Sequence, residues 1–474
     1  MRPTEAKDLP VPEKAPDPRT ERPPSGRPRA ADGRRSPGGR AQAPPDPHDR
    51  PGANRPDAVD AVDAVDAVDA VDAVDAVDGD VPAAVGRVLG ALLAERVEQA
   101  AALDPVFGRD LAERVARCTV EGGKRMRSQF VWWALRACGG GAAQAEAALR
   151  VGAALELIQT CALVHDDVMD GSRLRRGRLA LHADVTAQYA GSVSADRARR
   201  FGEAAAILAG DLALAWADDT VAAVEAPPGT ARALRDLWST MRTEMVAGQY
   251  LDLHGQATSS LSLARAVRAA CLKSALYSVE RPLALGAALA GADGARSAAL
   301  CSAGRCVGIA FQLRDDLADV FGDPRRTGKP AGGDIRAGKP TYLVAVARGR
   351  AETTGDRRAS AVLRHSLGRA DLSESGLAEV RDVLEATGAR DLVEAKIDRL
   401  VAQGMRHLDS AVLEPQARGR LRRLLHASAG TTPTSILSPS PSPSPSPSPG
   451  ACGGEDGGLP FTLLLSAGAD GVLR

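Results

Sequence analysis

Residues 155–170 read LELIQTCALVHDDVMD. Up to the aspartates, apolar residues recur at helical spacing, and neither glycine nor proline interrupts them. The pattern predicts a helix that ends in three carboxylates. Successive helical residues are about 100° apart, so Asp166 and Asp170 share a face one turn apart and Asp167 lies to the side. A hard cation can bridge the first and the last of these carboxylates.

A second stretch, residues 311–319, repeats this pattern as FQLRDDLAD after another apolar helical run. Its carboxylates are Asp315, Asp316 and Asp319. We therefore expect two acidic helix ends that face each other across one cavity. The pair Asp218-Asp219 provides an internal comparison, because no third carboxylate and no group of cations follows it. We interpret that pair as a solvated helix surface.

Basic residues follow each acidic stretch. They are Arg173, Arg175 and Arg176 after the first, and Lys329 and Lys339 after the second. Carboxylates that hold Mg²⁺, with arginine and lysine nearby, are what a bound diphosphate requires. The two lysines lie in a segment rich in glycine and proline, residues 322–339, which predicts a loop. Our hypothesis is that this loop closes over phosphates and excludes water.

Further candidate groups lie between the acidic stretches and before them. The stretch 121–127, EGGKRMR, places two glycines and three cations at the start of a predicted helix, which admits an anion close to the backbone. Gln249 and Asp252 share a helical face, suited either to orienting a metal-bound water or carboxylate, or to a buried network. Lys273 lies between apolar helical turns, where it needs an anionic partner.

The totals exclude several classes of protein. The 474 residues have a formal net charge of zero, which gives no indication of nucleic acid or an anionic membrane as a partner. The seven cysteines are scattered and contain no Cys-x-x-Cys pair, so they predict reduced thiols in a cytoplasmic protein. We expect no stable membrane insertion, because we find no uninterrupted run of eighteen apolar residues and no signal peptide.

Both ends of the chain have compositions typical of disorder. Residues 1–56 nearly lack large apolar side chains, and residues 438–449 alternate serine and proline. Residues 57–78 repeat Asp-Ala-Val, a period that gives neither a helix nor a strand a clean apolar side. We interpret this repeat as an acidic linker, with a partner-binding segment as the alternative. The expected organisation is a disordered tail at 1–81, a folded domain at 82–428 and a disordered tail at 429–474.

We expect the folded domain to be all-α, because its apolar residues recur at 3.6-residue spacing and strand-like alternation is scarce. The expected helices cover residues 82–103, 106–118, 124–138, 142–170, 201–225, 229–255, 262–274, 278–291, 296–321, 340–349, 373–387 and 389–410.

Together these motifs resemble those of the trans-isoprenyl diphosphate synthases, or polyprenyl synthetases. The matching motifs are Gly-Gly-Lys-Arg-x-Arg, Gln159 seven residues before Asp166, His-Asp-Asp-x-x-Asp, Arg-Arg-Gly, Lys273-Ser274, Phe-Gln-x-x-Asp-Asp-x-x-Asp, and Gly-Lys-Pro followed by Gly-Lys. They span nearly the whole expected domain in order. The family commonly has histidine in place of Gln159, whose amide can still donate to a phosphate. The resemblance implies a helical bundle of the isoprenoid-synthase type around a central cavity, and a homodimer.

By this resemblance, the chain joins isopentenyl diphosphate to an allylic diphosphate with Mg²⁺ as its cofactor. The implied metal ligands are Asp166, Asp167, Asp170, Asp315, Asp316 and Asp319. The implied catalytic groups are Lys273, Arg175, Lys329 and Gln312. Substrates would be held by these four residues and by Ser274, Lys339, Lys124, Arg125, Arg127, Gln159 and Arg176. Within that set, isopentenyl diphosphate would be held by Lys124, Arg127, Gln159 and Arg176.

The length of the product depends on what blocks the growing chain. Cys161 and Ala162, about one turn before Asp166, would line its path, and both are small. The open path favours geranylgeranyl diphosphate, with farnesyl diphosphate or a longer polyprenyl chain as alternatives. A neighbouring helix around Ile207 and Leu208 is a second candidate for the floor.

Two other interpretations of the same motifs are open. A class I terpene cyclase also ionises a diphosphate at an aspartate-rich helix, but it does not need the second anion site of EGGKRMR. Its second metal motif usually carries asparagine and serine, which residues 315–319 lack. A catalytically inactive subunit of a synthase is the other alternative, against which the intact aspartates and lysines argue.

Overall fold

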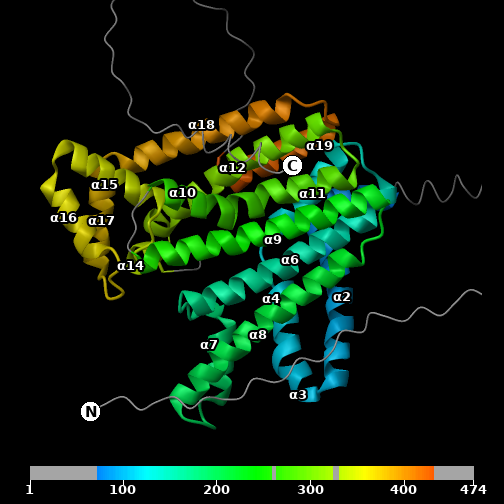
Figure 1. Ribbon diagram of the computed structural model, residues 1–474, viewed down its shortest axis with the longest axis horizontal. Coiled ribbons are helices and arrows are strands. Elements are labelled where there is room, and N and C mark those ends of the chain that lie inside the picture. The colour runs from blue at the N-terminus through cyan, green and yellow to red at the C-terminus, as the bar shows by residue number, and fades with distance from the viewer. Residues whose placement is uncertain (1–71, 259–262, 324–329, 432–474) are drawn as a thin grey trace, which may run out of the picture. The chain divides into compact units, whose positions relative to one another are not determined.

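The computed structural model describes residues 72–258, 263–323 and 330–431. This part of the chain is almost wholly helical, as the sequence predicts (Figure 1). The first helices are α2 (Val81–Leu103), α3 (Pro105–Phe107), the π-helix η1 (Gly108–Ala112), α4 (Glu113–Val120), α5 (Met126–Ala137) and α6 (Ala142–Met169). A hairpin follows, in which β1 (Leu174–Arg175) pairs antiparallel with β2 (Arg178–Leu179).

The chain after the hairpin is again helical. Its first elements are α7 (Leu181–Tyr189), α8 (Ala195–Ala222), α9 (Pro228–Ala257), α10 (Leu263–Ala270), the π-helix η2 (Cys271–Glu280), α11 (Arg281–Leu289) and α12 (Gly294–Phe321). The last described elements are α14 (Gly333–Ala337), α15 (Tyr342–Thr354), α16 (Arg357–Ser366), α17 (Glu374–Ala386), α18 (Ala389–Asp409) and α19 (Pro415–Ser428).

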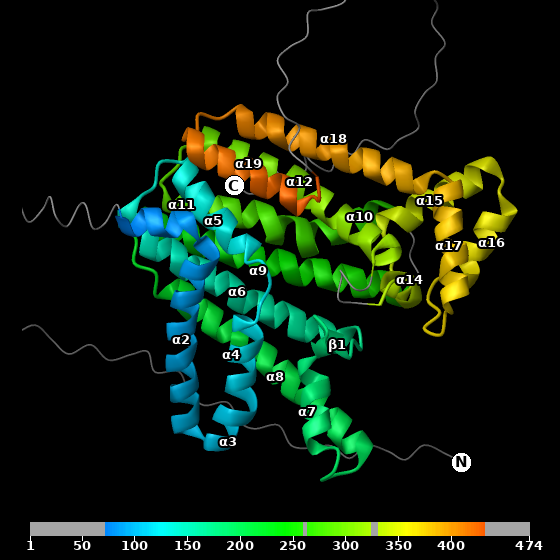
Figure 2. The same cartoon turned by 180° about the vertical axis from the view of Figure 1, so that it is seen from behind.

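The acidic stretches end two long helices, α6 and α12. α6 packs against α5 and α8, and α12 packs against η2 and α18. Figure 2 shows α6 and α8 side by side, as does Figure 1. Every residue of α6 from Val151 to Ile158 is buried, which explains why its sequence is apolar on all sides rather than along one stripe.

Small residues let α8 approach the end of α6. A Cβ atom on Gly210 would lie 2.1 Å from Nε2 of His165, so the imidazole occupies the space that a larger side chain would need. The same Nε2 lies 3.0 Å from the carbonyl oxygen of Ile207. His165 therefore packs against α8 at the position before Asp166.

α6 also has the length and apolar composition of a membrane-spanning helix. About 67% of its most apolar stretch is buried inside the bundle. Burial of this extent is what the central helix of a packed bundle shows.

The end of the Asp-Ala-Val repeat differs from our expectation. Residues 72–79 are helical, and Val74 and Val77, three residues apart, are buried. Asp78 accepts a hydrogen bond from Nε1 of Trp132 at 2.7 Å and lies 3.1 Å from Nη2 of Arg136. The prediction of a disordered tail to residue 81 was wrong here, because a period of three drifts only 60° per repeat and keeps two valines on one face. The remainder of both expected tails lies outside the described residues, apart from 429–431.

Four helices in the described part of the domain were not expected from the sequence: α7, α14, α16 and α19. α16 and α19 are rich in arginine, and their buried residues are few and widely spaced. In α19 these are Ala417, Leu421, Leu425 and His426. The available signal was the start of α19, where Glu414 accepts hydrogen bonds from two backbone N–H groups and Pro415 takes the first helical position.

We expect Asp78→Ala to lower the free energy of unfolding by about 1–3 kcal/mol, because it leaves the indole N–H of Trp132 and the guanidinium of Arg136 without their partner. Asp75→Ala is the matched control, since Asp75 holds the same place in the preceding repeat and is exposed. Its effect should stay within about 0.5 kcal/mol. Urea denaturation of both variants measures the difference, and equal stabilities would show that the docking of this helix does not depend on Asp78.

Candidate active site

One cavity of about 900 Å³ brings the two acidic stretches together. Asp166 and Asp170 line it from the end of α6, and Asp315, Asp316 and Asp319 line it from the end of α12. The expectation that two acidic helix ends share a cavity is confirmed.

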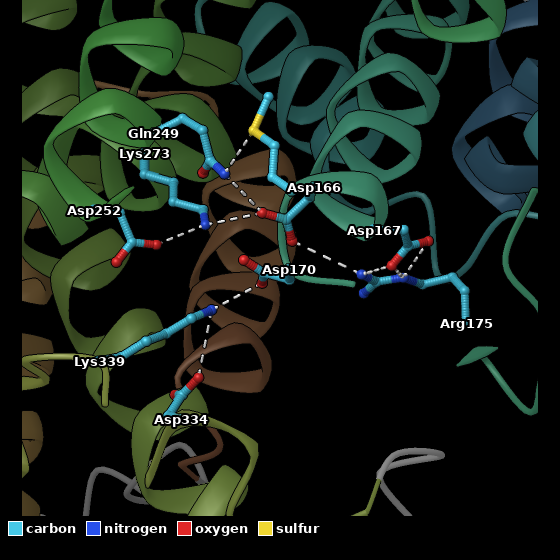
Figure 3. Close-up of polar contacts among 10 residues, drawn as sticks. Asp166, Asp167, Asp170, Arg175, Gln249, Asp252, Lys273, Asp334 and Lys339 are labelled. Carbon is cyan, nitrogen blue, oxygen red and sulfur yellow. Dashed lines mark hydrogen bonds and ion pairs between the residues drawn. The ribbon is translucent and has the colours of Figure 1, made fainter. Parts of the chain in front are cut away.

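Lys273 and Gln249 hold the carboxylate of Asp166. Its Oδ1 lies 3.1 Å from Nζ of Lys273 and 3.1 Å from Nε2 of Gln249 (Figure 3). Nζ of Lys273 also lies 2.9 Å from Oδ2 of Asp252. Burial acts to raise the pKa of Asp166, but the positive charges of Lys273 and Lys339 outweigh it and bring this pKa below its ordinary value. Asp166 is therefore ionised at neutral pH, and Lys273 has the anionic partner that its sequence context requires.

Close packing of α9 on η2 positions Lys273. A Cβ atom on Gly248 would lie 2.2 Å from the backbone nitrogen of Lys273 and 2.6 Å from its Cα. Only glycine fits at this contact. Because Gln249 and Asp252 follow on the same helix, the contact also places them beside Lys273, and all three residues line the cavity.

Lys339 holds Asp170. Its Nζ lies 3.1 Å from Oδ2 of Asp170 and 3.6 Å from Oδ1 of Asp334 (Figure 3). Burial acts to lower the pKa of Lys339, but the charges of Asp334 and Asp170 raise it above its ordinary value. Lys339 therefore stays charged and links the segment after α14 to the end of α6. Lys329, the other lysine predicted in this loop, lies outside the described residues.

Arg175 and Arg176 diverge at the hairpin. Nε of Arg175 lies 2.9 and 3.2 Å from the two carboxylate oxygens of Asp167, which is buried beside the cavity. Arg176 and Gly177 have φ values of 52° and 76°, so the turn uses left-handed backbone at both positions. Nη1 of Arg176 donates to the carbonyl oxygen of Glu121 at 3.4 Å. Arg175 thus pairs with the first acidic stretch, and Arg176 lies against the EGGKRMR segment.

The second acidic stretch concentrates negative charge. Asp316 accepts a hydrogen bond from Nε2 of Gln312 at 2.8 Å. Burial and the charge of Asp334 raise the pKa of Asp316 well above its ordinary value. Burial and the charge of Asp319 likewise raise the pKa of Asp334 to about 7. A cation among these carboxylates would relieve the repulsion.

Asp334 was not among the residues predicted from the sequence. Its backbone N–H donates to Oδ2 of Asp319 at 3.0 Å, and the carboxylate lines the cavity. Two glycines precede it, and a Cβ atom on Gly333 would lie 3.2 Å from Oδ1 of Asp319. The signal in the sequence was this Gly-Gly-Asp, which brings a backbone turn close to the second acidic stretch.

Two of the cations and amides predicted for a second anion site line the cavity: Arg127 and Gln159. Nη2 of Arg127 donates to Oγ of Ser278 at 2.8 Å. Nε of Arg127 and Oε1 of Gln159 are buried without a hydrogen-bond partner among the described residues. Ser274, Cys161 and Ala162 line the cavity as well.

Three other residues predicted for the second anion site do not line the cavity. Arg125 was predicted to hold a substrate, but its Nη1 donates to the carbonyl oxygen of Pro82 at 3.0 Å and its Nη2 to that of Val120 at 3.3 Å. These bonds fix a residue with φ of 48° and join the start of α5 to α2 and α4. Arg125 is therefore a structural residue. Lys124 and Arg176 are exposed and are not part of the cavity lining.

The described residues contain no three carboxylate, thiol or imidazole groups that already form a metal site. The aspartates of the first stretch are bonded to lysine and arginine instead. A cavity with two acidic helix ends, three compensating cations and an additional arginine is the arrangement expected of an all-α enzyme that acts on diphosphates.

Comparison with known proteins assigns the family. The polyprenyl synthetase model matches residues 109–380. A (2E,6E)-farnesyl diphosphate synthase from Mycobacterium tuberculosis is 31% identical over 304 residues, 64% of this chain and 78% of the relative. A geranylgeranyl diphosphate synthase from Methanosarcina mazei is 32% identical over 242 residues, 51% of this chain and 68% of the relative.

A solved structure is also similar. The geranylgeranyl pyrophosphate synthase from Corynebacterium glutamicum, complexed with isoprenyl diphosphate and magnesium, is 36% identical with a TM-score of 0.68. The match covers 73% of this chain and 98% of that chain. The chain belongs to the polyprenyl synthetase family, and it is a trans-prenyltransferase that elongates prenyl chains.

We expect Gly248→Ala to lower the free energy of unfolding by about 1–3 kcal/mol. Turnover should fall at least about tenfold, because the added methyl group forces Lys273 away from Asp166 and a small misplacement in a site is costly. Gly229→Ala is the matched control: it lies on the same helix, and a Cβ atom there would meet nothing within 4 Å. Denaturation and steady-state turnover measure both variants. If Gly248→Ala has the same stability and the same turnover as Gly229→Ala, the close packing of α9 on η2 does not position Lys273.

Proposed function

We propose that this enzyme condenses isopentenyl diphosphate with an allylic diphosphate, head to tail, and uses Mg²⁺ to do so. One observation carries the proposal: the two acidic stretches share a single cavity with Lys273, Lys339 and Arg175. The allylic diphosphate would bind among these groups, and isopentenyl diphosphate would bind beside Arg127 and Gln159.

The chemistry of the donor set fits a hard divalent ion. Asp166, Asp170, Asp315 and Asp319 offer carboxylate oxygens, which Mg²⁺ prefers. Mg²⁺ is usually held by one or two carboxylates and by phosphates of the substrate rather than by a complete protein cage. The lack of a ready-made cluster among the described residues agrees with this mode of binding. When bound, such ions would supply positive charge that stabilises the leaving diphosphate.

The cations of the cavity can change partners when a diphosphate binds. The ammonium group of Lys273 has three donors, of which two are used for Asp166 and Asp252. Lys273 can therefore keep one aspartate and still donate to a phosphate oxygen. Lys339 is placed in the same way between Asp170 and Asp334. These pairings with aspartate lower the cost of keeping the two lysines away from water.

The reaction needs no nucleophile from the protein. The bond between C1 of the allylic substrate and its diphosphate oxygen breaks, and the diphosphate takes both electrons. The double bond of isopentenyl diphosphate then attacks the allylic carbon, and the proton lost from the new chain goes to the departed diphosphate. Lys273, Lys339 and Arg175 act by stabilising the charge that develops on that leaving group.

We expect Asp166→Ala and Asp315→Ala each to lower turnover by roughly 100-fold or more while the helical fold persists. Asp219→Ala is the control, since Asp219 is largely exposed and pairs with Arg96 away from the cavity. The measurement is incorporation of radiolabelled isopentenyl diphosphate with Mg²⁺ and each allylic starter, alongside circular dichroism. Near-normal turnover in either cavity variant would refute the assignment, and no turnover in the wild type would favour an inactive subunit.

We propose geranylgeranyl diphosphate as the product. The curated relatives include synthases of both farnesyl and geranylgeranyl diphosphate, so support for the longer product comes from the cavity itself. Cys161 and Ala162 line the cavity and are small, which leaves the path of the growing chain open at this level. Ile207 and Leu208 are exposed and do not line it, whereas Leu214 of the same helix does.

Ala162→Phe should shorten the main product, because the ring fills the path one turn before Asp166. Ala162→Ser is the control for changing this position without filling the space. Chromatographic sizing of products made from dimethylallyl, geranyl and farnesyl diphosphates measures the outcome. A C15 end product from the wild-type enzyme, or an unchanged product from Ala162→Phe, would contradict the proposed path.

We also propose that the enzyme is a cytoplasmic homodimer. Ile207 and Leu208 on α8 are large apolar side chains that are exposed, and a second copy would cover them. The six cysteines in the described ranges are free thiols, which suits a reducing compartment. Light scattering that reports a single copy, or recovery of the native protein outside the cytoplasm, would overturn the respective proposal.

A further inference from the structure

Two neutral side chains of η2 hold Arg127 in the cavity wall. The guanidinium carbon of Arg127 lies 4.4 Å from the centroid of the Tyr277 ring, a distance at which a cation is attracted to an aromatic face. Nη2 of Arg127 donates to Oγ of Ser278 at 2.8 Å. All three residues line the cavity. The contact therefore joins the start of α5 to η2 at the wall of the active site.

These partners orient Arg127 without neutralising it. No carboxylate in the described part of the chain lies within ion-pair distance of its guanidinium, whereas Arg175, Lys273 and Lys339 each pair with an aspartate. Nε of Arg127 is buried and has no hydrogen-bond partner among the described residues. A half-buried guanidinium with an unused donor is a strong site for an anion, because its charge is only weakly screened there.

Tyr277 is firmly buried where it contacts Arg127. Tyr277 is only 3% exposed, and its hydroxyl has no partner in the described structure. A buried polar group without a hydrogen-bond partner lowers stability. The residue lines the cavity, and its ring contacts the guanidinium of Arg127.

We propose that Tyr277 and Ser278 are positioning residues, which aim Arg127 at the diphosphate of the non-allylic substrate while leaving its full positive charge available. The inference rests on the proposed function, since it takes isopentenyl diphosphate as the anion at Arg127. A carboxylate at position 278 would orient the guanidinium equally well, but it would cancel the charge that attracts the substrate. Neutral partners such as Tyr277 and Ser278 therefore orient Arg127 and preserve its positive charge.

The test separates the ring, the hydroxyl and the charge. Tyr277→Leu removes the aromatic face and should raise the KM for isopentenyl diphosphate roughly tenfold, with little change in the KM for the allylic substrate. Tyr277→Phe keeps the face and should restore most of the affinity. Ser278→Asp should raise the KM for isopentenyl diphosphate at least as much as Tyr277→Leu does. Ser278→Thr should leave this KM unchanged. Calorimetry with isopentenyl diphosphate alone gives a second readout, because a substrate that is not allylic does not ionise by itself.

Arg420→Ala is the matched control. Arg420 lies 5.6 Å from the Trp133 ring, so this variant loses an arginine–aromatic contact away from the cavity lining. Both substrate constants should remain unchanged in it. Equal losses in Tyr277→Leu and Tyr277→Phe, or equal changes in the KM of both substrates, would overturn the inference. If Tyr277→Leu does not fold, Ser278→Asp against Ser278→Thr decides. Failure of the proposed function would appear differently, as a wild-type enzyme that makes no product.

Discussion

Carboxylates that are taken out of water at the ends of α6 and α12 impose the main constraint on this structure. A buried carboxylate is costly unless a cation or several donors compensate it. Asp166 interacts with Lys273 and Gln249. Asp170 pairs with Lys339, and Asp167 pairs with Arg175. Each partner comes from a different part of the chain, so compensation at one helix end ties α9, η2, the hairpin and the segment after α14 to α6.

This compensation also explains details far from the aspartates. Lys273 reaches Asp166 only because Gly248 lets the backbones of α9 and η2 come into contact. Arg175 points to Asp167 because the turn after it accepts left-handed backbone at two successive residues. The fold therefore holds its cations at fixed places beside the aspartates, where the proposed diphosphate would meet them.

The sequence predicted the parts of the site that depend on spacing along one helix. Asp166 and Asp170 share a face and line the cavity, as their separation of one turn requires. It did not predict Asp334 or the role of Arg125, because both depend on contacts between segments. Asp334 reaches the cavity through a glycine turn packed on Asp319, and Arg125 is drawn away by two backbone carbonyls. The helical segment 72–79 was missed for the same reason, since its partners Trp132 and Arg136 lie on α5.

The cations of the cavity fall into two groups that suit different steps of the proposed reaction. Lys273, Lys339 and Arg175 have aspartate partners. When a diphosphate leaves these cations, the aspartate carboxylates take its place as their partners, which favours its release. Arg127 has only neutral partners, so it retains an anion more firmly. In head-to-tail condensation the allylic diphosphate departs, and the elongated product keeps the diphosphate of isopentenyl diphosphate. Release is thus easier at the aspartate-paired cations, where the diphosphate by-product forms.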